Sequence, residues 1–277
     1  MGYRAGQGDL SLFLTREQVR LFRKMEPDRQ VALIEAMTPG QVLSLDAMFE
    51  VWADDGQYTP DGEGWRVWLM MAGRGFGKTR AGAEWVNQLA MKRGMRIALV
   101  AANIDEARSV MVEGVSGILS VAKRNNVKVK WEPSLKKLTW PSGSSAELFS
   151  GDNADGMRGP EHHFAWCDEL AKWRQAEAAW TNLQMTLRGG PRPRALVTTT
   201  PRPMALLDRL RKDEWTIETG GRTKDNINLP KQFVDVMLAT YGKTRIGRQE
   251  LDGELIEDVE GSLWPRRLIE RCRSAVS

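Results

Sequence analysis

The sequence predicts an α/β fold in which a mostly parallel sheet is flanked by helices. Three observations support this prediction. A short apolar run, residues 67–72, passes through a glycine-rich turn into a helical pattern of apolar residues over 79–93. The alternation of strand and helix then repeats from residue 96 onward, which is typical of parallel sheets with crossover helices. The chain has 277 residues, enough for one large α/β domain with appendages or for two small domains.

The composition narrows the class of protein without deciding its function. A formal net charge of +4 is mildly basic, which is compatible with a nucleic-acid partner and does not require one. Cys167 and Cys272 are far apart, and His162 and His163 are adjacent, so we expect neither a zinc site nor a disulfide framework. We expect Cys167, His162 and His163 at packing or edge positions. No stretch approaches about eighteen apolar residues, and no signal-peptide core is present. We therefore expect an intracellular soluble protein with no membrane partner.

The first 54 residues predict a small helical appendage of two or three short helices. A capping box, Thr38 with Gln41, precedes apolar residues at helical spacing. Residues 54–64 are rich in Asp, Gly and Pro and predict a loop. Gln57 lies in this loop, shortly before the first core strand. It is either a side chain that binds an adenine edge or an ordinary solvated glutamine, and the sequence favours neither.

The glycine-rich turn has the pattern of a phosphate-binding loop. It lies between an apolar strand and a helix, and its residues are Gly73, Arg74, Gly75, Phe76, Gly77, Lys78 and Thr79. Glycines allow several backbone N–H groups to point at one phosphate chain, and the helix N-terminus adds positive potential. We expect Lys78 to reach the β and γ phosphates of ATP and Thr79 to place its hydroxyl on Mg²⁺.

The loop departs from the usual phosphate-loop pattern in two ways. Ala72 stands where the first glycine is expected, although Gly77, Lys78 and Thr79 are intact. Arg74 adds a second cation beside Lys78. A surface turn that merely holds glycine and lysine is the alternative interpretation, and the flanking strand and helix disfavour it. The sequence therefore predicts nucleotide binding.

The next segments predict the rest of a doubly wound sheet with an antiparallel extension at its edge. Residues 96–101 form a second apolar strand, and residues 104–123 form one crossover helix. Three short alternating segments follow, which predicts a meander of antiparallel strands at 127–131, 136–140 and 145–149.

A mostly apolar strand, residues 163–167, ends in two adjacent carboxylates, Asp168 and Glu169. In an enzyme with a phosphate loop, the first acid holds Mg²⁺ directly or through water. The second acid orients the water that attacks the γ phosphate, or accepts its proton. A solvated helix start is the alternative interpretation of this dipeptide. Its position after a strand and downstream of a phosphate loop favours the catalytic interpretation.

The remaining elements continue to alternate. We expect helices at 175–187, 204–211, 230–241 and 244–251 and strands at 194–200 and 215–219. Thr198, Thr199 and Thr200 close the first of these strands, where they are either β-branched filler or hydroxyl groups that sense the γ phosphate. The basic residues between Arg188 and Lys224 form a solvated surface or, as the alternative, a groove that faces phosphates.

Three motifs together resemble the large terminase subunit of tailed bacteriophages, the motor that pumps DNA into procapsids. They are GRGFGKTRAGAEW at 73–85, the pair Arg158-Gly159 with AWCDELAKW at 165–173, and TTTP at 198–201. The resemblance runs from about residue 57 to residue 264. It implies a P-loop NTPase core of the RecA/ASCE-like type that binds ATP and Mg²⁺.

The resemblance also implies roles for individual residues. The expected nucleotide contacts are Gln57, Gly73, Gly75, Gly77, Lys78, Thr79 and Arg80, and the expected metal ligands are Thr79 and Asp168. The expected catalytic residues are Arg74, Lys78, Arg158 and Glu169, and the coupling motif is Thr198, Thr199 and Thr200. The segment before the phosphate loop lacks an obvious arginine partner for Gln57.

Arg158 matches an arginine that, in some family members, inserts into the site of the neighbouring subunit. It lies in a loop, residues 151–160, whose glycines Gly156 and Gly159 allow movement. We place this loop at a sheet edge and expect Arg158 to act in trans. Pairing of Arg158 with Asp152 or Asp155, which would merely shape the loop, is the alternative.

Family members also carry a C-terminal nuclease domain of RNase H-like fold, and this sequence stops near the point where that domain begins. We therefore expect an ATPase-domain fragment without DNA cleavage: a helical appendage at 1–54, the ATPase core at 55–255 and a linker at 256–277. The resemblance implies double-stranded DNA, the portal protein and the small terminase subunit as partners. It further implies a homo-oligomeric ring on the portal, a monomer in isolation, and the cytoplasm of the infected bacterial host as the location.

Two other functions remain as alternatives to ATP-driven packaging. A helicase-like ATPase shares the phosphate loop and the acidic pair, but too little chain follows Thr200 for a second RecA-like domain. A nucleotide-gated assembly module would bind ATP without useful turnover. Glu169 argues against that module, because a pure switch does not need a carboxylate that orients water.

Overall fold

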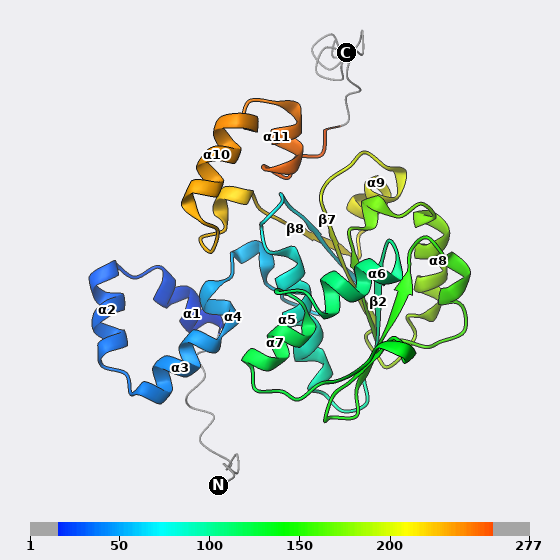
Figure 1. The fold of residues 1–277 in the computed structure, drawn as a ribbon, viewed down its shortest axis with the longest axis horizontal. Helices are drawn as coiled ribbons and strands as arrows, with labels where there is room; N and C mark the ends of the chain where they lie inside the picture. The colour runs from blue at the N-terminus through cyan, green and yellow to red at the C-terminus, as the bar shows by residue number, and fades with distance from the viewer. Residues whose placement is uncertain (1–15, 257–277) are drawn as a thin grey trace.

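The computed structural model describes residues 16–256, and at its centre is one eight-stranded sheet (Figure 1). The strands are β1 (Val67–Met71), β2 (Arg96–Ala101), β3 (Lys130–Glu132), β4 (Lys137–Thr139), β5 (Ser145–Ser150), β6 (Phe164–Asp168), β7 (Arg194–Thr199) and β8 (Thr216–Thr219). Their order across the sheet is β3-β4-β5-β2-β6-β7-β1-β8. All pairings from β5 to β8 along this order are parallel, whereas β3 and β4 are antiparallel to their neighbours. The predicted fold class is confirmed.

Helices cover both faces of the sheet (Figure 1). The helices in residues 16–256 are α1 (Arg16–Arg23), α2 (Pro27–Glu35), α3 (Pro39–Ala47), α4 (Phe49–Trp52), α5 (Lys78–Ala90), α6 (Ile104–Glu106), α7 (Ile118–Arg124), α8 (Ala176–Thr186), α9 (Ala205–Lys212), α10 (Lys231–Tyr241) and α11 (Arg245–Glu250), and only some of them pack on the sheet. Helices α5 and α7 contribute to one buried apolar cluster, and α8 and α9 contribute to another on the opposite face. Within residues 16–256, none of these helices has the length and apolar character needed to cross a membrane.

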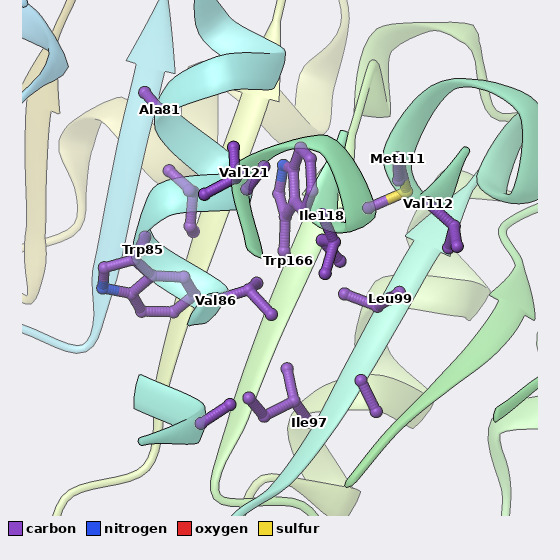
Figure 2. Packing of buried hydrophobic residues seen from close by; sticks show 14 of the residues in the cluster. Ala81, Trp85, Val86, Ile97, Leu99, Met111, Val112, Ile118, Val121 and Trp166 are labelled. Carbon is purple, nitrogen blue, oxygen red and sulfur yellow. The ribbon is translucent and has the colours of Figure 1, made fainter. Parts of the chain in front are cut away.

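Trp166 of β6 is a large, fully buried side chain of the first cluster (Figure 2). It lies directly under Gly82 of α5, where a Cβ atom would come within 2.2 Å of the indole ring. A residue larger than glycine would push the helix away from the sheet, because packed interiors leave no room for the added atom. Since α5 begins at Lys78, this contact also positions the helix start beside the end of β6.

The prediction of one crossover helix over 104–123 is wrong. The chain forms α6, then a turn of π-helix at Ala107–Val112, and after an interruption it resumes in α7 from Ile118. Gly114 and Gly117 lie in the interruption, and a Cβ atom at either would come within 2.6 or 2.8 Å of a preceding carbonyl oxygen. Glycine costs a helix about 1 kcal/mol relative to alanine, so the helix breaks where two glycines allow a tight turn.

The antiparallel extension is formed as predicted, with one displaced strand. β3 starts at Lys130 instead of residue 127, and β4 lies within the predicted segment 136–140. β5 is antiparallel to β4 and parallel to β2, so it connects the meander to the parallel core.

Helices α1 to α4 have a small cluster of buried residues of their own, formed by Val19, Phe22, Leu45 and Val51. The predicted capping box is present at the start of α3, where Thr38 and Gln41 cap each other. Most of the expected linker at 256–277 lies outside the described residues. The boundaries that we expected for the three segments of the chain stay predictions.

Candidate active site

The glycine-rich loop joins the carboxyl end of β1 to the first turn of α5. Gly75 and Gly77 have φ angles of 74° and 101°, in the left-handed region that glycine adopts without steric cost. Phe76 between them is buried, and its ring lies against Gly221. The buried ring fixes the loop to the protein interior. Lys78 follows as the first residue of a thirteen-residue helix. This is the backbone geometry that surrounds a phosphate group with N–H donors.

The Lys78 ammonium is buried at the centre of the site. It donates hydrogen bonds to the carbonyl oxygens of Ala72 (2.8 Å) and Gly73 (3.2 Å) and to the hydroxyl of Thr200 (3.2 Å). Its Nζ lies 3.8 Å from Oε1 of Glu169. Burial lowers the pKa of Lys78, and nearby carboxylates, Glu169 foremost, oppose this effect. The geometry holds one cation at a defined point beside the glycine-rich loop.

Asp168 and Glu169 follow one another at the end of β6, beside the threonines that end β7. The parallel register pairs Asp168 with Thr198, and the Thr198 hydroxyl donates to Asp168 Oδ1 at 2.7 Å. Burial raises the pKa of Asp168 to about 6, and this hydrogen bond opposes the rise. Thr200 donates to both oxygens of Glu169, from its backbone N–H to Oε2 (3.2 Å) and from its hydroxyl to Oε1 (3.3 Å). Both carboxylates are therefore oriented by the neighbouring strand.

The three threonines make different contacts. The Thr198 hydroxyl also accepts a hydrogen bond from the Trp166 indole (2.9 Å), and the Thr199 hydroxyl accepts one from the Ala171 backbone N–H (3.2 Å). The Thr200 hydroxyl joins the lysine to the glutamate, as described above. The three threonines therefore do more than fill space with β-branched side chains. Each hydroxyl links the end of β7 to the acidic turn or to the phosphate loop.

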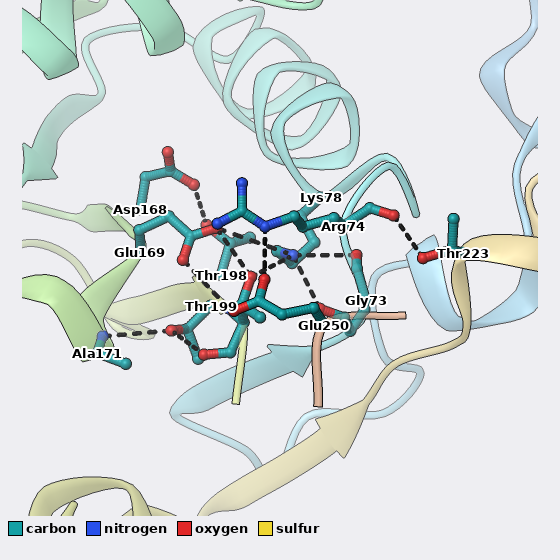
Figure 3. Close-up of polar contacts among 12 residues, drawn as sticks. Gly73, Arg74, Lys78, Asp168, Glu169, Ala171, Thr198, Thr199, Thr223 and Glu250 are labelled. Atoms are coloured by element: carbon teal, nitrogen blue, oxygen red, sulfur yellow. Dashed lines mark hydrogen bonds and ion pairs between the residues drawn. The ribbon is translucent and has the colours of Figure 1, made fainter. Parts of the chain in front are cut away.

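Thr223 and Glu250, the second of which is close to the end of the described chain, both contact Arg74 of the phosphate loop (Figure 3). Nε of Arg74 lies 2.5 Å from Oε2 of Glu250, and the Arg74 backbone N–H donates to the Glu250 carbonyl at 2.6 Å. Thr223 donates its hydroxyl to the Arg74 carbonyl (2.6 Å) and its backbone N–H to the Leu251 carbonyl (2.7 Å). We call Thr223, Glu250 and Leu251 the strap. Sequence reasoning missed Glu250, because nothing in its local pattern marks it as a partner of a residue 176 positions away.

The phosphate loop and the acidic turn face a cavity of about 880 Å³. The residues expected from the sequence that line it are Gln57, Arg74, Gly75, Gly77, Lys78, Thr79, Arg80, Glu169 and Thr200. The lining residues that were not expected include Phe49, Trp52, Lys172, Arg202, Asn226, Asn228 and Leu229. Lys172 lies in the motif that holds the acidic pair and Arg202 in the basic region, whereas the other five residues have no local sequence signal that marks them as site residues.

Gln57 and Arg80 are held by protein partners within the cavity wall. The Gln57 amide accepts from the Asp54 backbone N–H (2.8 Å) and donates to the carbonyl of Phe76 in the phosphate loop. Arg80 pairs with the buried Glu84 at 2.6 Å. These contacts fix both side chains at the rim of the phosphate loop.

Comparison with known proteins identifies the family. The profile described as "Terminase large subunit, T4likevirus-type, N-terminal" matches residues 69–271. The chain belongs to this family. No curated protein matches the sequence.

Solved large terminases have the same fold. The large terminase of a thermophilic bacteriophage aligns with a TM-score of 0.57 at 14% identity, over 77% of this chain and 52% of that one. The ATPase domain of the Thermus phage P74-26 large terminase aligns at 0.53 and 17%, over 77% of this chain and 97% of the domain. The HK97 bacteriophage large terminase aligns at 0.55 and 15%, over 79% and 51%. The chain thus spans about half the length of the first and the third of these terminases.

In this terminase chain, Arg158 lies apart from the residues that line the cavity. Its Nε is 3.3 Å from Oδ1 of Asp155, and both side chains are exposed. The loop that carries it connects β5 to β6, and both strands are interior in the sheet order, so the predicted edge position is wrong. The reason is that β2 pairs between β5 and β6, a crossover that the local pattern did not reveal.

The basic residues between Arg188 and Lys224 do not form one surface of free cations in the terminase fold. Arg188 and Arg192 precede β7, whereas Arg202 follows it and lines the cavity, so the set is divided between opposite ends of the sheet. Many members are paired with acids, as are Arg192 with Glu63 and Arg209 with Glu177. The solvated-surface interpretation describes these paired residues better than a continuous groove.

Proposed function

We propose that this chain binds ATP and Mg²⁺ and hydrolyses ATP to drive double-stranded viral DNA into a procapsid. Membership of the terminase family supports this proposal. The observation that carries it is the convergence of Lys78, Glu169 and Thr200, from three separate elements, within 3.8 Å of one another. A structure of the thermophilic-bacteriophage large terminase in complex with ADP, similar in fold with a TM-score of 0.56, is consistent with nucleotide binding at this fold.

Each residue of the site has a distinct proposed role. Lys78 holds the β and γ phosphates, together with the backbone N–H groups of the loop. Glu169 orients the attacking water and takes its proton, and Thr200 fixes both of its oxygens for that task. Arg74 supplies a second positive charge at the transferred phosphate. Thr198, Thr199 and Thr200 couple the phosphate site to β7.

The residues present fit a Mg²⁺ ion that is shared with the nucleotide. Mg²⁺ in such enzymes is held by one or two carboxylates and by substrate phosphates, and keeps several waters. Of the two carboxylate oxygens of Asp168, Oδ1 accepts a hydrogen bond from Thr198, and no described residue donates to Oδ2. Oδ2 can therefore bind an ion. Asp168 and the Thr79 hydroxyl are the proposed ligands. The ion would neutralise charge that develops on the phosphate oxygens.

The wider assembly is part of the same proposal. We infer that the portal protein and the small terminase subunit are partners, that subunits form a ring on the portal, and that the isolated chain is a monomer in the cytoplasm of the infected host. Residues 1–54 would act as a helical appendage, residues 55–255 as the ATPase core and residues 256–277 as a linker.

Turnover and binding measured on matched variants test the proposal. The chain is expected to hydrolyse ATP in Mg²⁺, with a rate that rises when duplex DNA and procapsids are added. Lys78→Ala is expected to lose ATP binding, because the closest positive charge to the phosphates is removed. Glu169→Gln is expected to keep ATP binding and to lose turnover, since only the water's orientation is damaged. Equal loss of ATP affinity in both variants would contradict these roles.

A further inference from the structure

Part of the cavity lining differs in chemical character from the phosphate loop. It includes Phe49 and Trp52 of α4 together with Asn226, Asn228 and Leu229, which belong to a segment that contacts Gly75. Trp52 is 41% exposed although it is a large aromatic side chain. We call these five residues the far end of the cavity. Apolar and aromatic side chains offer no hydrogen bond or charge to a phosphate group, so this part of the cavity suits a different part of the ligand.

Hydrogen bonds tie the far end to the phosphate loop. Asn226 donates from Nδ2 to the Gly75 carbonyl at 2.6 Å, and its Oδ1 accepts from the backbone N–H (3.0 Å) and Nδ2 (3.1 Å) of Asn228. Asn228 Nδ2 also donates to the Trp52 carbonyl at 3.4 Å. The Leu229 side chain is close to Gly75, where a Cβ atom would lie 3.1 Å from it. A ligand on the phosphate loop is therefore adjacent to these side chains.

The Asn228 amide has one unused hydrogen-bonding group. Its Nδ2 donates to Asn226 and to Trp52, whereas no described residue donates to its Oδ1. The Gln57 amide, by contrast, is engaged at both atoms by Asp54 and Phe76. Asn228 is thus the amide of this region that offers an acceptor to a ligand.

We propose that the far end holds the purine base of the nucleotide, and that Asn228 selects adenine over guanine. The proposal rests on the proposed function, whose phosphate site places the base nearby. Trp52 and Leu229 supply apolar contact for the faces of the ring, as aromatic and aliphatic side chains do for bases. Adenine carries an amino group at C6, which donates to Asn228 Oδ1. Guanine carries a carbonyl there, which leaves two acceptors facing each other without a proton.

Binding of three ligands to matched variants tests this proposal. The ligands are ATP, GTP and inorganic tripolyphosphate, each titrated calorimetrically with Mg²⁺. The unaltered chain is expected to bind ATP roughly tenfold or more tightly than GTP, because a site built to pair one group rejects its opposite. Asn228→Ala is expected to bring the ATP to GTP ratio close to one. Trp52→Ala is expected to weaken both nucleotides roughly tenfold through lost stacking.

Neither substitution is expected to change the affinity for tripolyphosphate, which has no base. Ile227→Ala and Trp215→Ala are the controls, because both side chains are exposed and neither lines the cavity. Both controls are expected to bind all three ligands as the unaltered chain does. If Asn228→Ala keeps the preference for ATP, or if Trp52→Ala weakens tripolyphosphate as much as ATP, the base site is wrong while the phosphate site stands. If neither ATP nor tripolyphosphate binds to the unaltered chain, the proposed function itself fails.

Discussion

Glu169 combines a proposed catalytic role with an unfavourable backbone conformation. Its φ angle is 48°, in the left-handed region that side chains other than glycine rarely adopt. Such a residue costs about 1–2 kcal/mol, and persists where the surrounding structure holds it and where function requires it. Here the Thr200 hydrogen bonds to both carboxylate oxygens hold the side chain toward Lys78. The strain is thus located at the residue that we assign to the water.

For this single residue, we predict that Glu169→Gly is more stable than Glu169→Ala by about 1 kcal/mol, because glycine removes the left-handed strain while both variants lose the same carboxylate. The free energy of unfolding is measured by urea titration. Glu177 in α8 is the matched control: it has helical backbone, so its Gly variant is expected to be less stable than its Ala variant. An alanine variant as stable as the glycine variant at Glu169 would show that the backbone there is unstrained.

Among the secondary-structure elements, the strap joins the last described helix to the phosphate loop. Glu250 contacts Arg74 through both its side chain and its backbone carbonyl. The Arg74 side chain is 65% exposed, so the ion pair adds at most about 1 kcal/mol to stability. Its more important effect is on Arg74 itself, because the hydrogen bond to Glu250 raises the pKa of Arg74 and orients its guanidinium. In the proposed function, the nucleotide phosphates would therefore compete with Glu250 for this cation.

We predict that Glu250→Gln increases ATP affinity a few-fold, since Arg74 no longer has to leave a carboxylate to reach the phosphates. The same substitution is expected to speed amide hydrogen exchange in α11, where the side-chain contact to the loop is weakened. Calorimetry and hydrogen exchange measure the two effects. Glu254→Gln is the control, because Glu254 pairs with Arg248 at 3.9 Å and not with Arg74. Unchanged exchange and affinity in Glu250→Gln would mean that the strap does not restrain the loop.

Across the molecule as a whole, the cavity contains Lys78 and Arg74 but not Arg158. Arg158 is exposed and pairs with Asp155, which is the partner named in the alternative interpretation of this arginine. A pair in which the side chains are 72% and 81% exposed is worth little, so a stronger anion releases the arginine easily. A neighbouring subunit's triphosphate is such an anion. The contact with Asp155 is therefore compatible with action in trans.

We predict that Arg158→Ala lowers ATP turnover in the assembled state without changing nucleotide affinity. Arginine fingers contribute roughly 10³ to 10⁵ in rate, and turnover per subunit is expected to rise with concentration or on the portal only when Arg158 is present. Steady-state ATPase assays over a range of concentrations measure this. Asp155→Asn is the control, and it is expected to retain the rise because it only frees the arginine.

Mixing variants gives the sharper test of action in trans. An Arg158→Ala subunit has an intact site, and a Glu169→Gln subunit still carries its arginine. Their mixture is expected to regain activity under conditions of assembly, since the second subunit donates its arginine to the first. A mixture no more active than either variant alone would exclude the trans role.

Short-range patterns in the chain were enough to predict the order of the elements, the phosphate loop and the acidic pair. These patterns are apolar runs, glycines that allow positive φ, and carboxylates at the end of a strand. Residues 96–101 were predicted as a strand with its observed bounds, and the family resemblance rested on motifs of the same kind. Local prediction failed at 104–123, where apolar periodicity favours a helix and two glycines disfavour it. We predicted one helix from the periodicity, but the helix breaks at Gly114 and Gly117.

Only the packing of the whole chain decides which of these residues are in contact. The order β6-β7-β1 places Asp168 beside Thr198 and brings Thr200 to Lys78, although 122 residues separate the last two. The contact of Glu250 with Arg74 and the hydrogen bond from Asn228 to Trp52 have no local signal at all. The physical reason is that strand order and helix packing are set by the burial of the whole core. Contacts between distant segments follow from that arrangement, and no single stretch of sequence encodes them.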